Sequence, residues 1–122
     1  MTDRILIIGE LGSEVQAFAD ALAQDYTLSL APTVLDAGKR LQKESCAAIV
    51  FDAPEGGAPT ADILRTLQQV APGTPILVTS KGQDPRMIVE AVQAGASDFV
   101  TRPFAPEKLR LSVRRLLETR SL

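Results

Sequence analysis

The 122-residue sequence has no histidine, no tryptophan and a single cysteine. Without histidine it lacks the usual general base and the commonest metal-ligating side chain. That absence excludes Ser-His-Asp and Cys-His catalytic sites and histidine-rich metal sites, and we predict that the chain is not an enzyme. The lone Cys46 cannot form an internal disulfide, and beside Ala47 and Ala48 it is predicted to be a small core residue.

Long apolar runs and a strong excess of one charge are also missing. No run approaches the roughly 20 residues of a membrane span, and the N-terminus leads into a strand-like segment without a signal-peptide layout. The formal net charge of −2 gives no electrostatic case for nucleic acid. We therefore expect a cytoplasmic protein that contacts neither a membrane nor nucleic acid directly.

What is present is an alternation of apolar strand-like segments and helical periodicity. Hydrophobic residues make up 45% of the chain, which suits one compact domain over residues 1–122. Strands are predicted over residues 4–8, 26–30, 47–51, 75–79 and 97–100. Helices are predicted in between, with Ser13, Thr33, Thr60 and Asp84 as N-caps, Gly95 as a left-handed C-cap and Pro106 opening the last helix. Such alternation predicts an α/β fold, a parallel sheet with helices on both faces.

One acidic residue follows the third predicted strand directly. The run from Ala47 to Phe51 is apolar without alternation, as in a parallel strand buried on both faces. Asp52 then lies at the carboxyl end of that strand, where open α/β sheets bind their ligands. An acid at a strand end is also a common turn or cap residue, so this position alone leaves both interpretations open.

Several motifs in the second half of the chain point to one family. They are Ile76-Leu-Val-Thr-Ser80, Ala91-Val-Gln-Ala-Gly95-Ala96-Ser97, Asp98-Phe99-Val100 and Arg102-Pro103-Phe104. Together they resemble the receiver domain of bacterial two-component response regulators, and the resemblance covers essentially the whole chain. It implies a flavodoxin-like (βα)5 doubly wound parallel sheet with strand order 2-1-3-4-5, which would place Glu10 and Asp52 at neighbouring strand ends.

The resemblance also implies a phosphorelay function and a metal site. Asp52 matches the family's phosphoacceptor, which receives a phosphoryl group from a histidine kinase. Mg²⁺, bound weakly here, would be held by Glu10, Asp52 and the backbone carbonyl of Pro54.

Further residues match the family's phosphoryl contacts and its switch. Ser80 and Arg102 would contact the phosphoryl group, and Ser80 and Phe99 would change conformation when the site is occupied. The spacing to Pro75 and Gly95 favours Ser80 over Thr79 for this role, while the register one residue earlier stays open.

Some positions depart from the family pattern. Gly9 stands where the family has an acid, so one carboxylate is lost and Mg²⁺ is expected to bind more weakly. Lys81 stands where the family prefers a small residue, and it would either block the pocket or bring it a second cation. The loop after Asp52 lacks the family's usual proline four residues on, and its Glu55 is either a partial replacement for the lost acid or a solvated carboxylate.

Arg102 replaces the family's lysine. It keeps the positive charge but is planar and longer. Two roles are open: a bidentate contact to a phosphoryl group, or a permanent pair with Asp52 that lowers the pKa of that carboxyl. The resemblance also predicts a cis Arg102–Pro103 bond.

Partners and alternatives follow from the same comparison. The resemblance implies a histidine kinase, an output domain in the same chain or a downstream protein, and a homodimer through the fourth helix, fifth strand and fifth helix. A longer regulator with this domain at its N-terminus is expected. The alternative function is a phosphorylation-independent pseudo-receiver that acts as a dimerisation or docking module. A flavodoxin-like cofactor binder, suggested by Gly9-x-x-Gly12, ranks below both because few aromatic residues are available for stacking.

Overall fold

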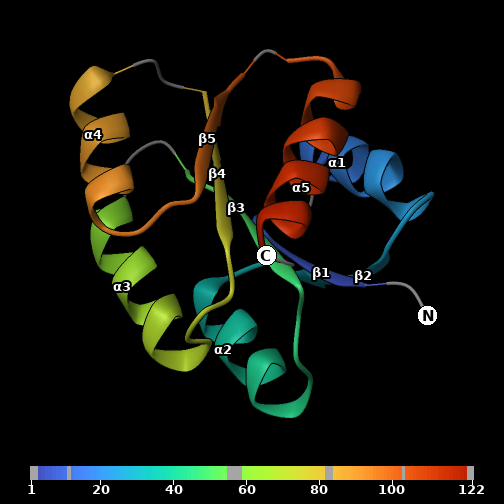
Figure 1. Cartoon of the computed structure of the whole chain (residues 1–122), viewed down its shortest axis with the longest axis horizontal. Coiled ribbons are helices and arrows are strands. Elements are labelled where there is room, and N and C mark those ends of the chain that lie inside the picture. Colours follow the sequence, from blue (N-terminus) through green and yellow to red (C-terminus); the bar gives the residue numbers. More distant parts are fainter. Residues whose placement is uncertain (1–2, 11, 55–58, 82–83, 103, 121–122) are drawn as a thin grey trace.

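Strands and helices alternate five times along the chain (Figure 1). The structure is a computed structural model, and it describes residues 3–10, 12–54, 59–81, 84–102 and 104–120. The strands are β1 Arg4–Ile8, β2 Thr27–Ala31, β3 Ala48–Asp52, β4 Ile76–Ser80 and β5 Asp98–Thr101. The helices are α1 Ser13–Ala23, α2 Val34–Lys43, α3 Thr60–Val70, α4 Pro85–Gln93 and α5 Pro106–Arg120.

The strands form one parallel sheet in the order β2-β1-β3-β4-β5, which confirms the predicted topology. The register pairs Ile8 of β1 with Phe51 of β3, and Asp52 of β3 with Thr79 of β4. Because all strands are parallel, their carboxyl ends meet along one edge of the sheet. The chain reverses its direction of winding between β1 and β3, and that point is where ligands bind in sheets of this kind.

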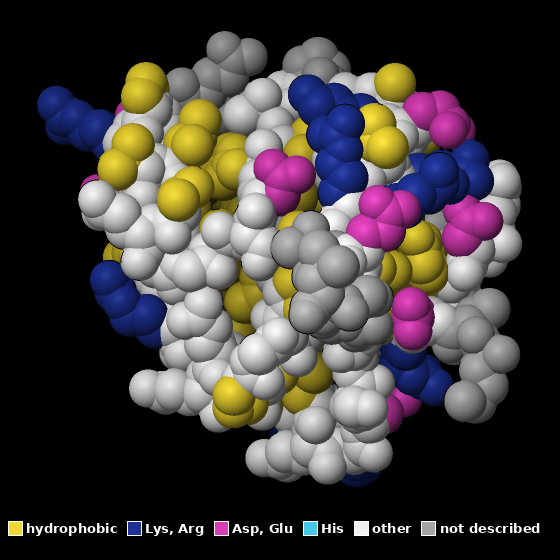
Figure 2. All heavy atoms as spheres, viewed as in Figure 1, with side chains coloured by type: hydrophobic (Ala, Val, Ile, Leu, Met, Phe, Trp, Pro, Cys, Tyr) yellow, Lys and Arg dark blue, Asp and Glu magenta, His cyan; other side chains and the backbone are white. Residues whose placement is uncertain are grey.

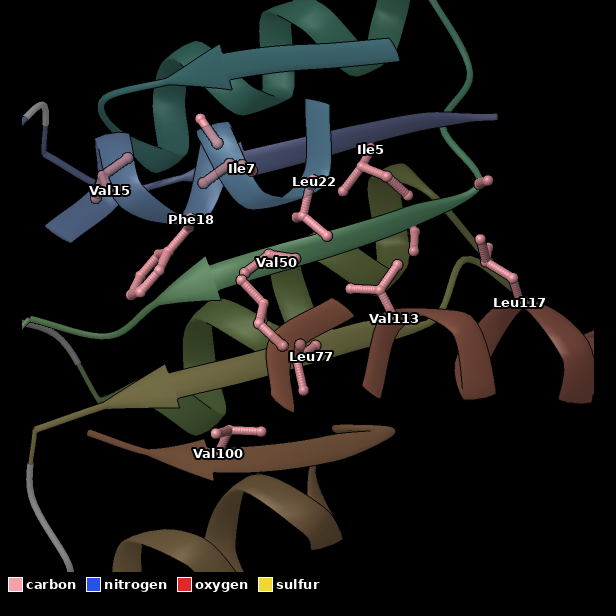
Figure 3. Close-up of a cluster of buried hydrophobic side chains, with 14 residues drawn as sticks. Ile5, Ile7, Val15, Phe18, Leu22, Val50, Leu77, Val100, Val113 and Leu117 are labelled. Carbon is pink, nitrogen blue, oxygen red and sulfur yellow. The ribbon is translucent and has the colours of Figure 1, made fainter. Parts of the chain in front are cut away.

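Each face of the sheet is covered by a different set of helices (Figure 1). On one face α1 and α5 pack on the odd-numbered residues Ile5 and Ile7 of β1 (Figure 3), and on the other face α2, α3 and α4 pack on Leu6 and Ile8. Successive side chains of a strand point to opposite faces, so an apolar strand without alternation supplies both cores. Val50 and Leu77 continue the first core across the sheet.

Four of the strands begin and end one residue later than predicted, whereas β1 matches its predicted bounds. For β4 the cause is clear, because Pro75 has no N–H to donate to a ladder. Its carbonyl only accepts, from the N–H of Ile49 at 2.9 Å. The shift has a consequence for the site, since Asp52 and Ser80 become the last residues of β3 and β4.

The predicted helix ends are partly confirmed. Thr33 caps α2 by accepting a hydrogen bond from the N–H of Asp36 at 3.1 Å, and Asp84 caps α4 ahead of Pro85. The predicted caps Ser13 and Thr60 are wrong: each is the first helical residue, after Gly12 and Pro59, which have no side-chain donor or acceptor. Gly95 has a φ of 109° after α4, and Pro106 is the first residue of α5, as predicted.

No helix in the described part of the chain is long and apolar enough to cross a membrane.

Candidate functional site

A cleft of about 660 Å³ lies at the carboxyl ends of β1 and β3. Its walls are apolar where β1, β3, α2 and α3 contribute Ile8, Phe51, Val34 and Ile63. The charged side chains on the cleft are Glu10, Glu14, Asp52, Lys81 and Arg102. The structure therefore brings together acids from β3, α1 and the end of β1 with two cations that follow β4 and β5.

Asp52 is held by two donors at one of its oxygens. Its side chain is 13% exposed. Oδ1 accepts the hydroxyl hydrogen of Thr79 at 2.9 Å and lies 3.2 Å from Nη2 of Arg102. Burial raises the pKa of Asp52 above its ordinary value, and the Thr79 hydrogen bond and the Arg102 charge oppose that rise. Since both donors approach Oδ1, Oδ2 is the oxygen that no described residue bonds.

Thr79 reaches Asp52 because of the strand register. The two residues are paired across β3 and β4, and neighbouring residues of a strand point to opposite faces. Ser80 therefore points away, and its hydroxyl lies 3.9 Å from the Sδ atom of Met87 on α4. The sequence-based preference for Ser80 over Thr79 did not foresee that Thr79 is the hydroxyl bonded to Asp52. The contact of Ser80 with a phosphoryl group stays a prediction.

Arg102 lies between two carboxylates. Its backbone N–H donates to the carbonyl of Ser80 at 2.7 Å, which fixes the residue at the end of β4 and β5. From there Nη2 pairs with Asp52, and Nη1 donates a hydrogen bond to Oε2 of Glu14. The pair with Asp52 is one of the two roles that the sequence left open. A role for Glu14 in the site was not predicted from the sequence. The signal that the sequence offered was its position as the acidic residue in the first turn of α1, the helix that follows β1.

Gly9 is packed tightly against Asp52. A Cβ atom at this position would lie 3.0 Å from Cβ of Asp52 and 3.2 Å from Cγ2 of Val15. Both distances are shorter than ordinary van der Waals contacts. Besides lacking an acid, this position therefore has no room for a Cβ unless Asp52 or Val15 shifts.

A match to a known family accompanies this geometry. The family model for the response regulator receiver domain matches residues 5–114. The chain belongs to the response regulator receiver domain family.

Curated relatives of this receiver domain are longer proteins. AlgB, the alginate biosynthesis transcriptional regulatory protein of Pseudomonas syringae pv. tomato, is 26% identical over 98% of the chain and 27% of its own length. The transcriptional regulatory protein KdpE of Staphylococcus aureus is 30% identical over 93% of the chain and 49% of its own length. The chain therefore spans about a quarter to a half of these relatives.

Solved structures of similar shape agree on the fold. The CheY-like receiver domain protein from Methanospirillum hungatei superposes with a TM-score of 0.89 at 18% identity, over 99% of this chain and 98% of that chain. A response regulator from Thermotoga maritima gives a TM-score of 0.88 at 24% identity, over 97% and 99%. These superpositions confirm the predicted fold, and the family model confirms the predicted receiver family of phosphorelay systems.

The predicted metal ligands of the receiver domain share the cleft. Glu10 and Pro54 are exposed and line it with Asp52. Among the described residues no group of three or more Asp, Glu, Cys or His side chains is arranged to hold a metal ion. Two carboxylates and a backbone carbonyl are nevertheless oxygen donors, the kind that Mg²⁺ takes while keeping several waters. The donor chemistry thus fits Mg²⁺ with few protein ligands.

The remaining predicted residues are placed as follows. Phe99 is partly buried and packs on the core formed with α2, α3 and α4. Lys81 is exposed and lines the cleft. Glu55 and the predicted cis Arg102–Pro103 bond lie outside the described residues.

Proposed function

We propose that this receiver domain accepts a phosphoryl group from a histidine kinase on Asp52. The observation that carries the proposal is the position of Asp52: it ends β3, lines the cleft and faces the guanidinium of Arg102 at 3.2 Å. Transfer of a phosphoryl group to a carboxylate requires a nearby cation, because the negative charge on the phosphoryl oxygens must be offset. Asp52 has such a cation in Arg102.

In the proposed transfer a carboxylate oxygen of Asp52 attacks phosphorus in line with the kinase's phosphohistidine nitrogen. The new O–P bond forms as the N–P bond breaks, and the bonding electrons return to the imidazole. Oδ2 is the available oxygen, because Oδ1 is already engaged by Thr79 and Arg102. Arg102 would stabilise the charge on the equatorial oxygens, and Ser80 would supply a hydroxyl after the switch.

Mg²⁺ belongs to the same proposal. Glu10, Asp52 and the carbonyl of Pro54 would hold it, and it would supply positive charge beside the phosphoryl group. Gly9 provides no third carboxylate, so we expect weaker binding than in receivers with an acid there.

The proposed output surface is formed by α4, β5 and α5. Figure 2 shows hydrophobic side chains gathered over α4, and Val89 and Val92 of this helix are 53% and 55% exposed. Acidic and basic side chains are mixed over α5 in the same view. Phosphorylation would change the rotamer of Phe99 and the affinity of this surface for a second copy or an output domain. Such a change requires the phosphoryl group on Asp52 to interact more favourably with one conformer of the domain than with the other.

We also propose which part of a longer protein this domain forms. AlgB and KdpE are named as transcriptional regulators. We infer that the chain is the N-terminal receiver of a longer cytoplasmic regulator whose output domain acts on transcription, and that this domain itself does not contact DNA.

Amide NMR spectra test the proposal. Mg²⁺ and then beryllofluoride, a mimic of the acyl phosphate, are added to the wild-type domain and to Asp52→Asn. We expect shifts around Asp52, Thr79, Ser80 and Phe99 in the wild type that are absent from the variant. Each protein is also incubated with a small phosphodonor, and its intact mass is measured. We expect the mass of one added phosphoryl group in the wild type and not in Asp52→Asn.

The opposite result favours the alternative function. If millimolar Mg²⁺ and beryllofluoride leave the wild-type spectrum unchanged, Asp52 is not a phosphoacceptor. The domain would then act as a docking module through its surface.

A further inference from the structure

The guanidinium of Arg102 connects three parts of the fold. Nη2 faces Oδ1 of Asp52 at the end of β3, and Nη1 bonds Oε2 of Glu14 in the first turn of α1. Arg102 itself follows β5. A single side chain therefore joins residues that are far apart in the sequence, and its two terminal nitrogens are divided between two carboxylates.

Burial makes this arrangement asymmetric. The side chains of Arg102 and Asp52 are 11% and 13% exposed, whereas that of Glu14 is 48% exposed. Nε of Arg102 is buried without a hydrogen-bond partner in the described part of the chain. The guanidinium is thus held only at its Nη ends, and Glu14 is the partner that water can replace.

The planar guanidinium matters for the chemistry at Asp52. Its parallel N–H groups suit bidentate contact with phosphoryl oxygens, which a lysine ammonium cannot provide. While Glu14 occupies Nη1, only Nη2 is directed at the oxygens of Asp52. A phosphoryl group on Asp52 that contacts both Nη atoms must compete with Glu14 for Nη1.

We propose that Glu14 is a positioning residue that holds one arm of Arg102 and thereby limits the contact of the guanidinium with a phosphoryl group on Asp52. This inference rests on the proposed function, since it concerns the same reaction. Glu14 bonds Arg102 and not Asp52, although, besides burial, its charge also raises the pKa of Asp52. Its release would convert Arg102 from a bridge between two acids into a bidentate phosphoryl clamp.

The test variant is Glu14→Gln, which keeps the size of the side chain and removes its charge. Glu14 is half exposed, so we take the about 0.2–1 kcal/mol of a surface ion pair and expect beryllofluoride with Mg²⁺ to bind roughly 1.5- to fivefold more tightly. The matched control is Asp20→Asn, an equal charge change on the exposed face of the same helix, where Asp20 accepts a side-chain hydrogen bond from Gln16. We expect no change in affinity for the control.

A second measurement reports on Arg102 without any ligand. The side-chain ¹⁵N signals of Arg102 are recorded for the free wild type, Glu14→Gln and Asp20→Asn. We expect Glu14→Gln to shift the Nη signals and to speed rotation of the guanidinium, and Asp20→Asn to leave both unchanged. A purely structural role of Glu14 in α1 would not move these signals selectively.

The outcomes separate this inference from the proposed function. Unchanged Arg102 signals in Glu14→Gln would overturn the inference, because no pair would exist to hold the guanidinium. Changed signals with unchanged or weaker beryllofluoride affinity would overturn it too, since Glu14 would not limit the contact. If even the wild type fails to bind beryllofluoride, the proposed function falls and the inference falls with it.

Discussion

Thr79 donates its hydroxyl hydrogen to Oδ1 of Asp52 over 2.9 Å, while its neighbour Ser80 faces Met87 on α4. The two hydroxyls at the end of β4 are thus divided between the two faces of the sheet. Thr79 holds the carboxylate, and a contact of Ser80 with a phosphoryl group stays a prediction.

Removing the Thr79 hydroxyl tests this division. In Thr79→Val we expect the pKa of Asp52 to rise further, because a hydrogen bond that favours the charged form is lost. A carboxylate hydrogen bond contributes about 1.5–3 kcal/mol, so the variant also loses stability at neutral pH. Carbon-detected NMR titration of the Asp52 carboxyl measures the pKa. Ser80→Ala should leave it unchanged in the free domain, and an equal effect of both variants would contradict the division.

We expect that any larger residue in place of Gly9 would displace Asp52. In Gly9→Ala the added methyl would lie 3.0 Å from Cβ of Asp52, which we expect to cost about 1–3 kcal/mol of unfolding free energy. Gly38→Ala within α2 is the control, because a Cβ there meets nothing within 4 Å. We expect the control to stabilise the domain by about 0.5–1 kcal/mol. Urea unfolding compares the two, and a stabilised Gly9→Ala would show that the gap at β1 is looser than the structure indicates.

Because Asp52 is buried, we expect it to lower the free energy of unfolding by an amount that depends on pH. Because its folded pKa lies above the ordinary value of 3.8, its contribution to stability is complete below that value and is lost as pH rises through the folded pKa. Asp52→Asn should therefore be more stable than the wild type at pH 7, within the about 0.5–2 kcal/mol that single stabilising substitutions commonly give. The advantage should shrink as the pH falls towards 4. Thermal unfolding across that range measures it, and a gain that grows in acid would have the wrong sign.

The turn after α4 depends on a glycine. Gly95 has a φ of 109°, and a Cβ there would meet the side-chain amide of Gln68, whose Nε2 donates to the Gly95 carbonyl at 3.3 Å. We expect Gly95→Ala to cost about 1–2 kcal/mol through backbone strain, and to displace the side chain of Gln68 on α3 from the Gly95 carbonyl. Gly73→Ala is the comparison, since it shares a positive φ of 82° but meets no atom within 4 Å. Equal losses in the two variants would mean that the contact with Gln68 contributes nothing.

The sequence by itself determined the alternation of strands and helices and the parallel sheet, and the resemblance to receiver domains supplied its strand order. Five apolar strands separated by helical periodicity leave few arrangements, and runs without alternation such as Ala48–Phe51 are stable only when both faces are covered. Asp52 was found for the same reason, because a charge that ends such a run must lie at the edge of the sheet. Caps were predictable where the side chain had a local partner, as at Thr33, and were wrong at Thr60, where the helix began at the residue itself.

Only the tertiary structure decided which side chains meet Asp52. The register between β3 and β4 placed Thr79 beside it, and a shift of one residue would have placed Ser80 there. The pairing of Arg102 with Glu14 joins residues 88 positions apart, so no local pattern contains it. The close approach of Gly9 likewise exists only once β1 and β3 are adjacent. The succession of strands and helices follows from the local hydrophobic pattern, whereas contacts at the cleft depend on distances between elements that a sequence does not record.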